Sequence, residues 1–130
     1  MRHLIHSFAV GALRRGKTIE QFLGEIQTEH GRGIRWLEIS PTRDGFIVYR
    51  GDVVDVGTDD RLDISVFPWL DPEHEDDDDR MAVAATPEEA LAFAERFLAA
   101  HPDRWVNQGV VCDEYADYRR ARTPQPPAGP

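Results

Sequence analysis

One run of residues, 71–79, gathers most of the groups that could bind a metal ion or a cationic partner. It contains seven carboxylates, with His74 among them. Calcium loops of the helix–loop–helix kind need a glycine at their sixth position, where the chain turns sharply. The sixth position counted from Asp71 is Asp76, so the pattern does not predict a calcium site. We therefore expect at most weak cation binding here, and neither a metal nor another cofactor.

Other side chains with catalytic potential lack the neighbours that catalysis requires. None of the three serines lies in the Gly-x-Ser-x-Gly pattern of hydrolases. Cys112 is followed by two carboxylates, which would raise the pKa of its thiol, so we expect a buried structural cysteine. His3 and His6 lie three residues apart on a predicted helix, but no third metal ligand is in view. The chain thus carries no catalytic signature, which favours a non-catalytic protein but leaves an enzyme open as an alternative.

Negative charge is concentrated in one part of the chain. The formal net charge is −9, and twelve of the 24 acidic residues lie within residues 52–80, where only Arg61 and Arg80 oppose them. The remainder of the chain is close to neutral. A concentrated negative field attracts cationic proteins and repels nucleic acid and anionic membranes. We therefore expect a basic protein partner, and no binding to nucleic acid or to a membrane.

The predicted partner surface combines these acids with one aromatic residue. Trp69 stands just before the acidic run, and tryptophan is a frequent anchor of protein interfaces, although the position at the end of the sheet favours a residue that closes the core. A run of acids is also typical of a solvated surface loop. The predicted partner-binding residues are Asp52, Asp55, Asp63, Trp69, Asp71, Glu73, Glu75, Asp76, Asp77, Asp78 and Asp79.

These features favour a non-catalytic protein-binding domain. A small acidic immunity protein or antitoxin that neutralises a basic toxin has these properties, although none of them is specific to that class. Two alternatives remain open. One is a small-ligand-binding protein or enzyme with a site on the sheet that uses Glu38 and Tyr49. The other is a regulatory or scaffold subunit of a larger complex.

The centre of the chain predicts an antiparallel meander. Three segments show the alternation of half-buried strands, namely residues 34–40, 46–56 and 62–69. In the first of these, Leu37 and Ile39 would share the buried face. Asp44-Gly45 predicts a turn, and Gly51-Asp52 predicts a bulge or a bend.

Helical patterns precede and follow the meander. Residues 2–14 are amphipathic, and a second, shorter helix is expected to begin after Thr18. Thr86-Pro87 is the strongest helix start, because threonine caps the first turn and proline fits the first helical position. A last helix is predicted over residues 113–122, whereas residues 71–85 are expected to form a loose connection.

The predicted fold class is α+β: a three- to four-stranded antiparallel meander with helices before and after it packed on one face. We expect one domain over residues 1–122 and a disordered proline-rich tail over residues 123–130. A single cysteine excludes an internal disulfide and favours a reducing compartment. No apolar run approaches the roughly 20 residues of a membrane span. We therefore expect a cytoplasmic protein.

Overall fold

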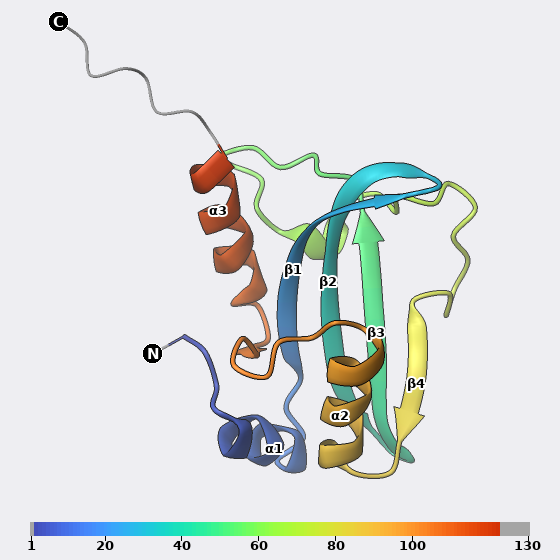
Figure 1. The fold of residues 1–130 in the computed structure, drawn as a ribbon, viewed down its shortest axis with the longest axis vertical. Coiled ribbons are helices and arrows are strands. Elements are labelled where there is room, and N and C mark those ends of the chain that lie inside the picture. Colours follow the sequence, from blue (N-terminus) through green and yellow to red (C-terminus); the bar gives the residue numbers. More distant parts are fainter. Residues whose placement is uncertain (1, 123–130) are drawn as a thin grey trace, which may run out of the picture.

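Five antiparallel strands form one sheet in the computed structural model, which describes residues 2–122. The expected tail, 123–130, lies outside the described residues. The strands are β1 (Ile19–Thr28), β2 (Gly31–Thr42), β3 (Gly45–Val53), β4 (Arg80–Ala84) and β5 (Val106–Asn107), in the order β4-β3-β2-β1-β5 (Figure 1). The helices are α1 (His6–Arg14), α2 (Pro87–Phe97), α3 (Val111–Arg122) and a short 3-10 helix, η1 (Ile64–Val66). The predicted α+β fold with an antiparallel meander is confirmed.

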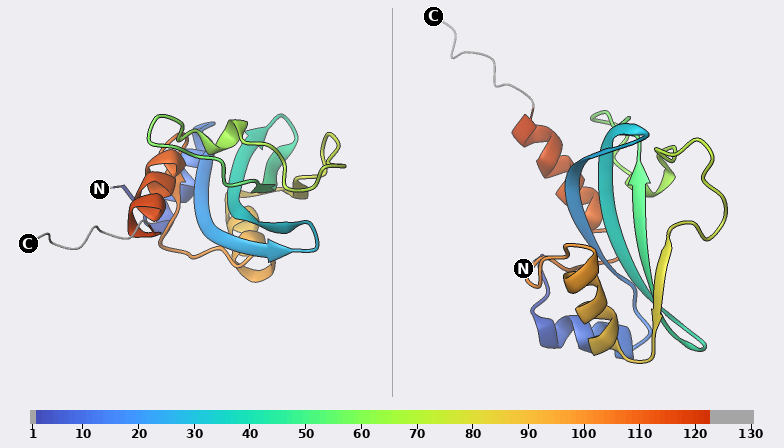
Figure 2. Two further views of the ribbon diagram at one scale, coloured as in Figure 1. Left: turned by 90° about the horizontal axis from the view of Figure 1, so that it is seen from above. Right: turned by 45° about the vertical axis from the view of Figure 1, so that its right-hand side comes forward.

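Helices cover both faces of this sheet. Leu37 and Ile39 do share one face, and they are fully buried in a cluster that includes the apolar residues of α1 and α2. Helices α1 and α2 thus pack on one face, as predicted for helices before and after the meander, whereas the last helix, α3, does not. The opposite face carries a second cluster, in which Ile34 and Val53 pack with Tyr115 of α3. Figure 2 shows α3 on the far side of the sheet from α2.

The prediction of a second helix after Thr18 is wrong, because this segment forms β1. Ile19 packs beneath α1 and α2, whereas Phe22 packs on the other face against Tyr115 and Tyr118 of α3. A strand that is buried on both faces shows no regular alternation of apolar and polar residues. Its apolar spacing therefore resembles that of a helix.

The predicted strand over residues 62–69 is also wrong. Ile64 and Phe67 are buried beside α3, and Asp63 begins η1 by accepting a hydrogen bond from the Ser65 amide. Only an isolated bridge joins Trp69 to the edge of β3. The fourth strand of the meander is β4, which comes from the end of the segment that was expected to be loose.

The irregularities of the sheet also differ from the prediction. Gly51 pairs in register with Trp36, so there is no bulge at Gly51-Asp52. Register shifts occur between Phe22 and Gly24 of β1 and beside Tyr49 of β3. At Gly24 the backbone has φ of 91°, a left-handed conformation that glycine adopts without strain.

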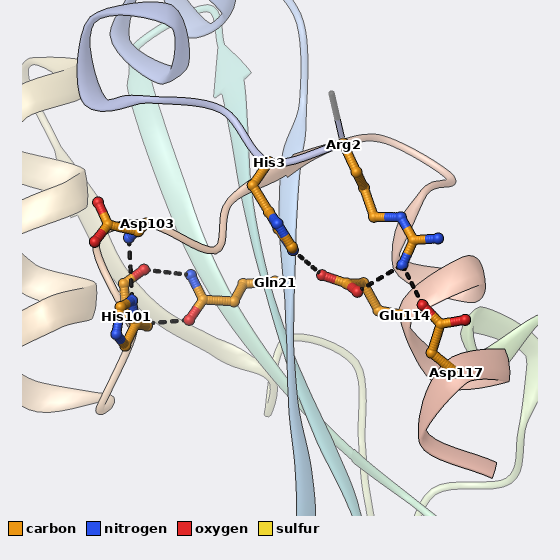
Figure 3. Close-up of polar contacts among 7 residues, drawn as sticks. All are labelled: Arg2, His3, Gln21, His101, Asp103, Glu114 and Asp117. Atoms are coloured by element: carbon orange, nitrogen blue, oxygen red, sulfur yellow. Dashed lines mark hydrogen bonds and ion pairs between the residues drawn. The ribbon is translucent and has the colours of Figure 1, made fainter. Parts of the chain in front are cut away.

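Polar contacts tie the N-terminal segment and the turn after α2 to the rest of the fold (Figure 3). Arg2 and His3 both bond to Glu114 of α3. His3 precedes α1, so it does not share a helix with His6 as predicted. The buried amide of Gln21 donates to the His101 carbonyl at 2.9 Å and accepts from its N–H at 2.6 Å. Strand β1 is thereby joined to the connection that leads into β5.

The Thr86 cap provides a direct test of the predicted helix start. Thr86 Oγ1 accepts a hydrogen bond of 3.1 Å from the Glu89 amide, and Pro87 occupies the first position of α2. We expect Thr86→Ala to lower the free energy of unfolding by about 1 kcal/mol, because one amide of the first turn loses its partner. Urea denaturation measures this change. Thr58→Ala, at an exposed threonine away from any helix start, should leave the free energy within a few tenths of a kcal/mol.

Candidate cation-binding surface

Part of the acidic segment is neutralised by α3. The Asp55 carboxylate accepts a hydrogen bond from the Tyr115 hydroxyl, and its other oxygen lies 3.3 Å from Nη1 of Arg122. Arg119 donates to Asp59 at 3.0 Å. These two carboxylates thus face cations that the last helix supplies.

Two more of the predicted partner-binding acids have partners inside the domain. Asp52 accepts hydrogen bonds of 2.6 and 2.9 Å from Arg35, a two-pronged arrangement that is strong among ion pairs. Asp63 accepts from the backbone and the hydroxyl of Ser65. Asp52, Asp55 and Asp63 thus all have hydrogen-bond partners inside the domain, and of these three only Asp52 also lies close to the acids that follow Trp69.

Residues 71–79, which we call the acidic loop, project beyond the edge of β3 at the point where β4 begins (Figures 1 and 2). Its own carboxylates shape its turns: Asp71 accepts from the Glu73 amide and Asp78 from the Glu75 amide, both at 2.8 Å. Asp71 also lies 3.6 Å from His30, and Asp77 lies 3.4 Å from Arg80. Of the seven carboxylates of this loop, those that make no ion pair with a cation within residues 2–122 are Glu73, Glu75, Asp76, Asp78 and Asp79.

A small cavity, which we call the aromatic pocket, lies beside this loop. Its volume is about 80 Å³, and its lining residues are Trp36, Glu38, Tyr49, Gly51, Trp69 and Asp79. The pairing of β2 with β3 places Trp36 opposite Gly51 and Glu38 opposite Tyr49, so these four residues share one sheet face. Glu38 and Tyr49, the two residues named for a possible site on the sheet, therefore both line this cavity.

Trp69 forms an outer wall of this pocket. Its ring is stacked on His74 with 3.7 Å between the ring centroids, and 40% of the residue remains exposed. Trp69 therefore does not close the core; it presents an aromatic ring next to the acidic loop. Gly51 makes room for the second tryptophan, since a Cβ there would lie 2.9 Å from Nε1 of Trp36.

Glu38 gives the pocket a partly buried acid. Burial is the main cause that raises the pKa of Glu38, and the nearby Asp79 raises it further, while the hydrogen bond of 2.9 Å from the Ser40 hydroxyl opposes them. A carboxylate in this environment is stabilised by any cation that approaches it. The pocket thus combines aromatic surface with unneutralised negative charge.

A wider hollow, of about 390 Å³, lies on the opposite face of the sheet and is bordered by the same loop. Arg35, Arg50 and Asp52 line its floor, and His30 and His74 contribute to its rim. Because both cationic and anionic side chains line this hollow, it lacks the single sign of charge that distinguishes the aromatic pocket.

No protein-family model, curated protein or solved structure matches this chain. Its function is therefore inferred from its own residues. Among residues 2–122, no three His, Cys, Asp or Glu side chains are placed to hold a metal ion, and no helix is both long and apolar enough to cross a membrane.

Cys112 and Glu20 are two further groups in this part of the fold whose pKa values are raised. Burial is the main cause that raises the pKa of Cys112, and Asp63 and Glu20 add to it. The predicted direction is thus correct, but the carboxylates involved are distant in sequence and not the two that follow Cys112, and the cysteine is only partly buried. Sequence reasoning missed Glu20, whose burial depends on both β5 and the turn at Gly109.

Proposed function

We propose that this protein is a non-catalytic binding domain whose acidic loop engages a positively charged protein. The observation that carries the proposal is the set of loop carboxylates without a cationic partner in the described chain, next to the exposed ring of Trp69. Asp52, Asp55 and Asp59 are compensated by arginines, so much of the surplus negative charge lies in the loop at one edge of the sheet.

Electrostatics and aromatic surface would have different roles in such an interface. A local field of one sign steers a cationic partner and raises its association rate, an effect that falls steeply with added salt. An exposed tryptophan supplies apolar area, which slows dissociation. The acidic loop thus governs the encounter, and Trp69 contributes to the lifetime of the complex.

The test compares two variants that change the net charge equally. In the first, Glu73→Gln, Glu75→Gln and Asp76→Asn neutralise loop carboxylates that make no ion pair within residues 2–122. In the second, Asp44→Asn, Glu95→Gln and Asp103→Asn neutralise acids of the β2–β3 turn, α2 and the turn after it. The association rate with an arginine-rich peptide is measured by stopped flow at several salt concentrations.

We expect the loop variant to associate about tenfold more slowly at low salt and to show a weaker salt dependence. The second variant should stay within about twofold of the unchanged protein, because its charges lie away from the loop. Equal slowing in both variants would show that only the net charge matters and would contradict the proposal.

Within this class we propose a basic toxin as the partner, with the protein acting as its immunity protein or antitoxin. The surplus of acidic residues and the loop carboxylates that make no ion pair within residues 2–122 support this proposal. Co-purification with a basic toxin domain encoded by a neighbouring gene, and inhibition of that toxin, would test it. A toxin that stays fully active in the presence of excess protein would contradict it.

A further inference from the structure

We propose that the aromatic pocket receives the guanidinium group of an arginine side chain from the basic partner. This inference rests on the proposed function and adds the site at which one residue of the partner is recognised. It follows from three properties of the pocket: its aromatic walls, its unpaired carboxylates and its size.

Aromatic walls reach the pocket from three separate segments. Trp36 comes from β2, Tyr49 from β3 and Trp69 from the segment bridged to the edge of β3. The face of an aromatic ring attracts a cation, and tryptophan does so most strongly. Stacking on His74 holds the Trp69 ring in place, so this wall exists before a ligand arrives.

The two carboxylates of the pocket have no cationic partner in the described chain. Within residues 2–122, neither Glu38 nor Asp79 makes an ion pair. Arg80, the cross-strand neighbour of Tyr49, bonds to Asp77 and does not line the pocket. Two carboxylates therefore remain available to a cation that enters from outside.

Size and shape favour arginine over a larger cation. The pocket, of about 80 Å³, is smaller than the hollow of about 390 Å³ on the opposite face and suits a compact group such as guanidinium. Guanidinium is planar and weakly hydrated, it stacks on aromatic rings, and its several N–H groups can reach two carboxylates at once. The ammonium group of lysine carries the same charge, but it is not planar and does not stack on aromatic rings in this way.

The experiment titrates the protein with N-acetyl-arginine methylamide and follows the three tryptophan indole N–H signals by NMR. The signals of Trp36 and Trp69 should shift, whereas that of Trp105, which is 1% exposed in the core, should not. N-acetyl-citrulline methylamide has nearly the same shape without the charge, and it should produce no saturable shift.

Substitutions of the lining residues test whether these shifts report binding inside the pocket. We expect Glu38→Gln and Trp69→Ala each to weaken binding of the arginine derivative about tenfold. Glu95→Gln removes the same charge from α2 and should leave the dissociation constant unchanged. The indole spectrum of each variant also reports whether the fold is retained, since the Trp105 signal depends on an intact core.

The outcomes separate this inference from the proposed function. If the arginine derivative leaves Trp36 and Trp69 unshifted while the arginine-rich peptide still binds through the loop, the pocket inference is overturned and the proposed function stands. Equal binding of the citrulline derivative, or full affinity in Glu38→Gln, would overturn it as well. If neither the peptide nor the derivative binds, both proposals fail.

Discussion

At pH 8, we expect Glu20→Gln to raise the free energy of unfolding by about 3 kcal/mol. Glu20 is only 4% exposed, and burial raises its pKa from 4.5 to about 7. Each pKa unit corresponds to about 1.4 kcal/mol between the two protonation states. The ionised carboxylate is therefore costly in the folded protein, and the neutral amide of glutamine removes that cost. Its side-chain oxygen can still accept the hydrogen bond of 2.7 Å from the Gly109 amide.

The sign of this effect depends on pH. Between about pH 4.5 and 7 the folded protein holds the Glu20 proton more tightly than the unfolded chain does, so the contribution of Glu20 to stability falls as pH rises through this range. The gain from Glu20→Gln should be small at pH 4 and complete above pH 7. Urea denaturation at several pH values measures it, with Glu73→Gln in the exposed loop as the control. A gain that does not depend on pH would contradict this explanation.

Gly57→Ala should destabilise the protein by about 3 kcal/mol, because nothing larger than hydrogen fits at this position. A Cβ on residue 57 would lie 2.5 Å from Cε2 and 2.7 Å from Cζ of Tyr115, which is fully buried. The same approach lets the Gly57 amide donate to the Tyr115 hydroxyl at 3.1 Å, and that hydroxyl donates to Asp55. The substitution therefore disturbs both the aromatic cluster under α3 and the carboxylate that this helix neutralises.

Gly11→Ala is the matched control, with an expected effect of opposite sign. Gly11 lies inside α1, and a Cβ there would meet only the flexible end of Arg15 at 3.0 Å. Alanine favours a helix over glycine by about 1 kcal/mol, so this variant should be more stable than the unchanged protein. Thermal unfolding of both variants tests the pair. Equal destabilisation at the two positions would show that the close contact with Tyr115 is not the cause.

The effect of Gly57→Ala bears on the proposed surface, because it concerns the half of the acidic segment whose carboxylates are paired inside the domain. Tyr115, Arg119 and Arg122 hold Asp55 and Asp59 against α3. The acidic loop has no comparable set of cations in the described chain. Variants of Gly57 should therefore change stability, whereas variants of Glu73, Glu75 and Asp76 should change the association rate.

Elements with short-range signals could be predicted from the sequence. The Thr86-Pro87 start of α2, the turn before Gly45 and the two central strands depend on backbone sterics and on hydrogen bonds between near neighbours. The sharing of one buried face by Leu37 and Ile39 follows from the period of two in a strand. The same local reasoning failed for β1, because its two faces are covered by helices that are remote in sequence.

The sequence by itself determined that the chain is acidic and that the surplus carboxylates follow β3. Only the tertiary structure decided which of them lack a cation, because the arginines that neutralise Asp52, Asp59 and Asp55 lie 17, 60 and 67 positions away. Tertiary structure likewise gathered Trp36, Tyr49 and Trp69 around Glu38. The register between β2 and β3 and the long connection from β3 to β4 set that arrangement. No short stretch of residues encodes either of them.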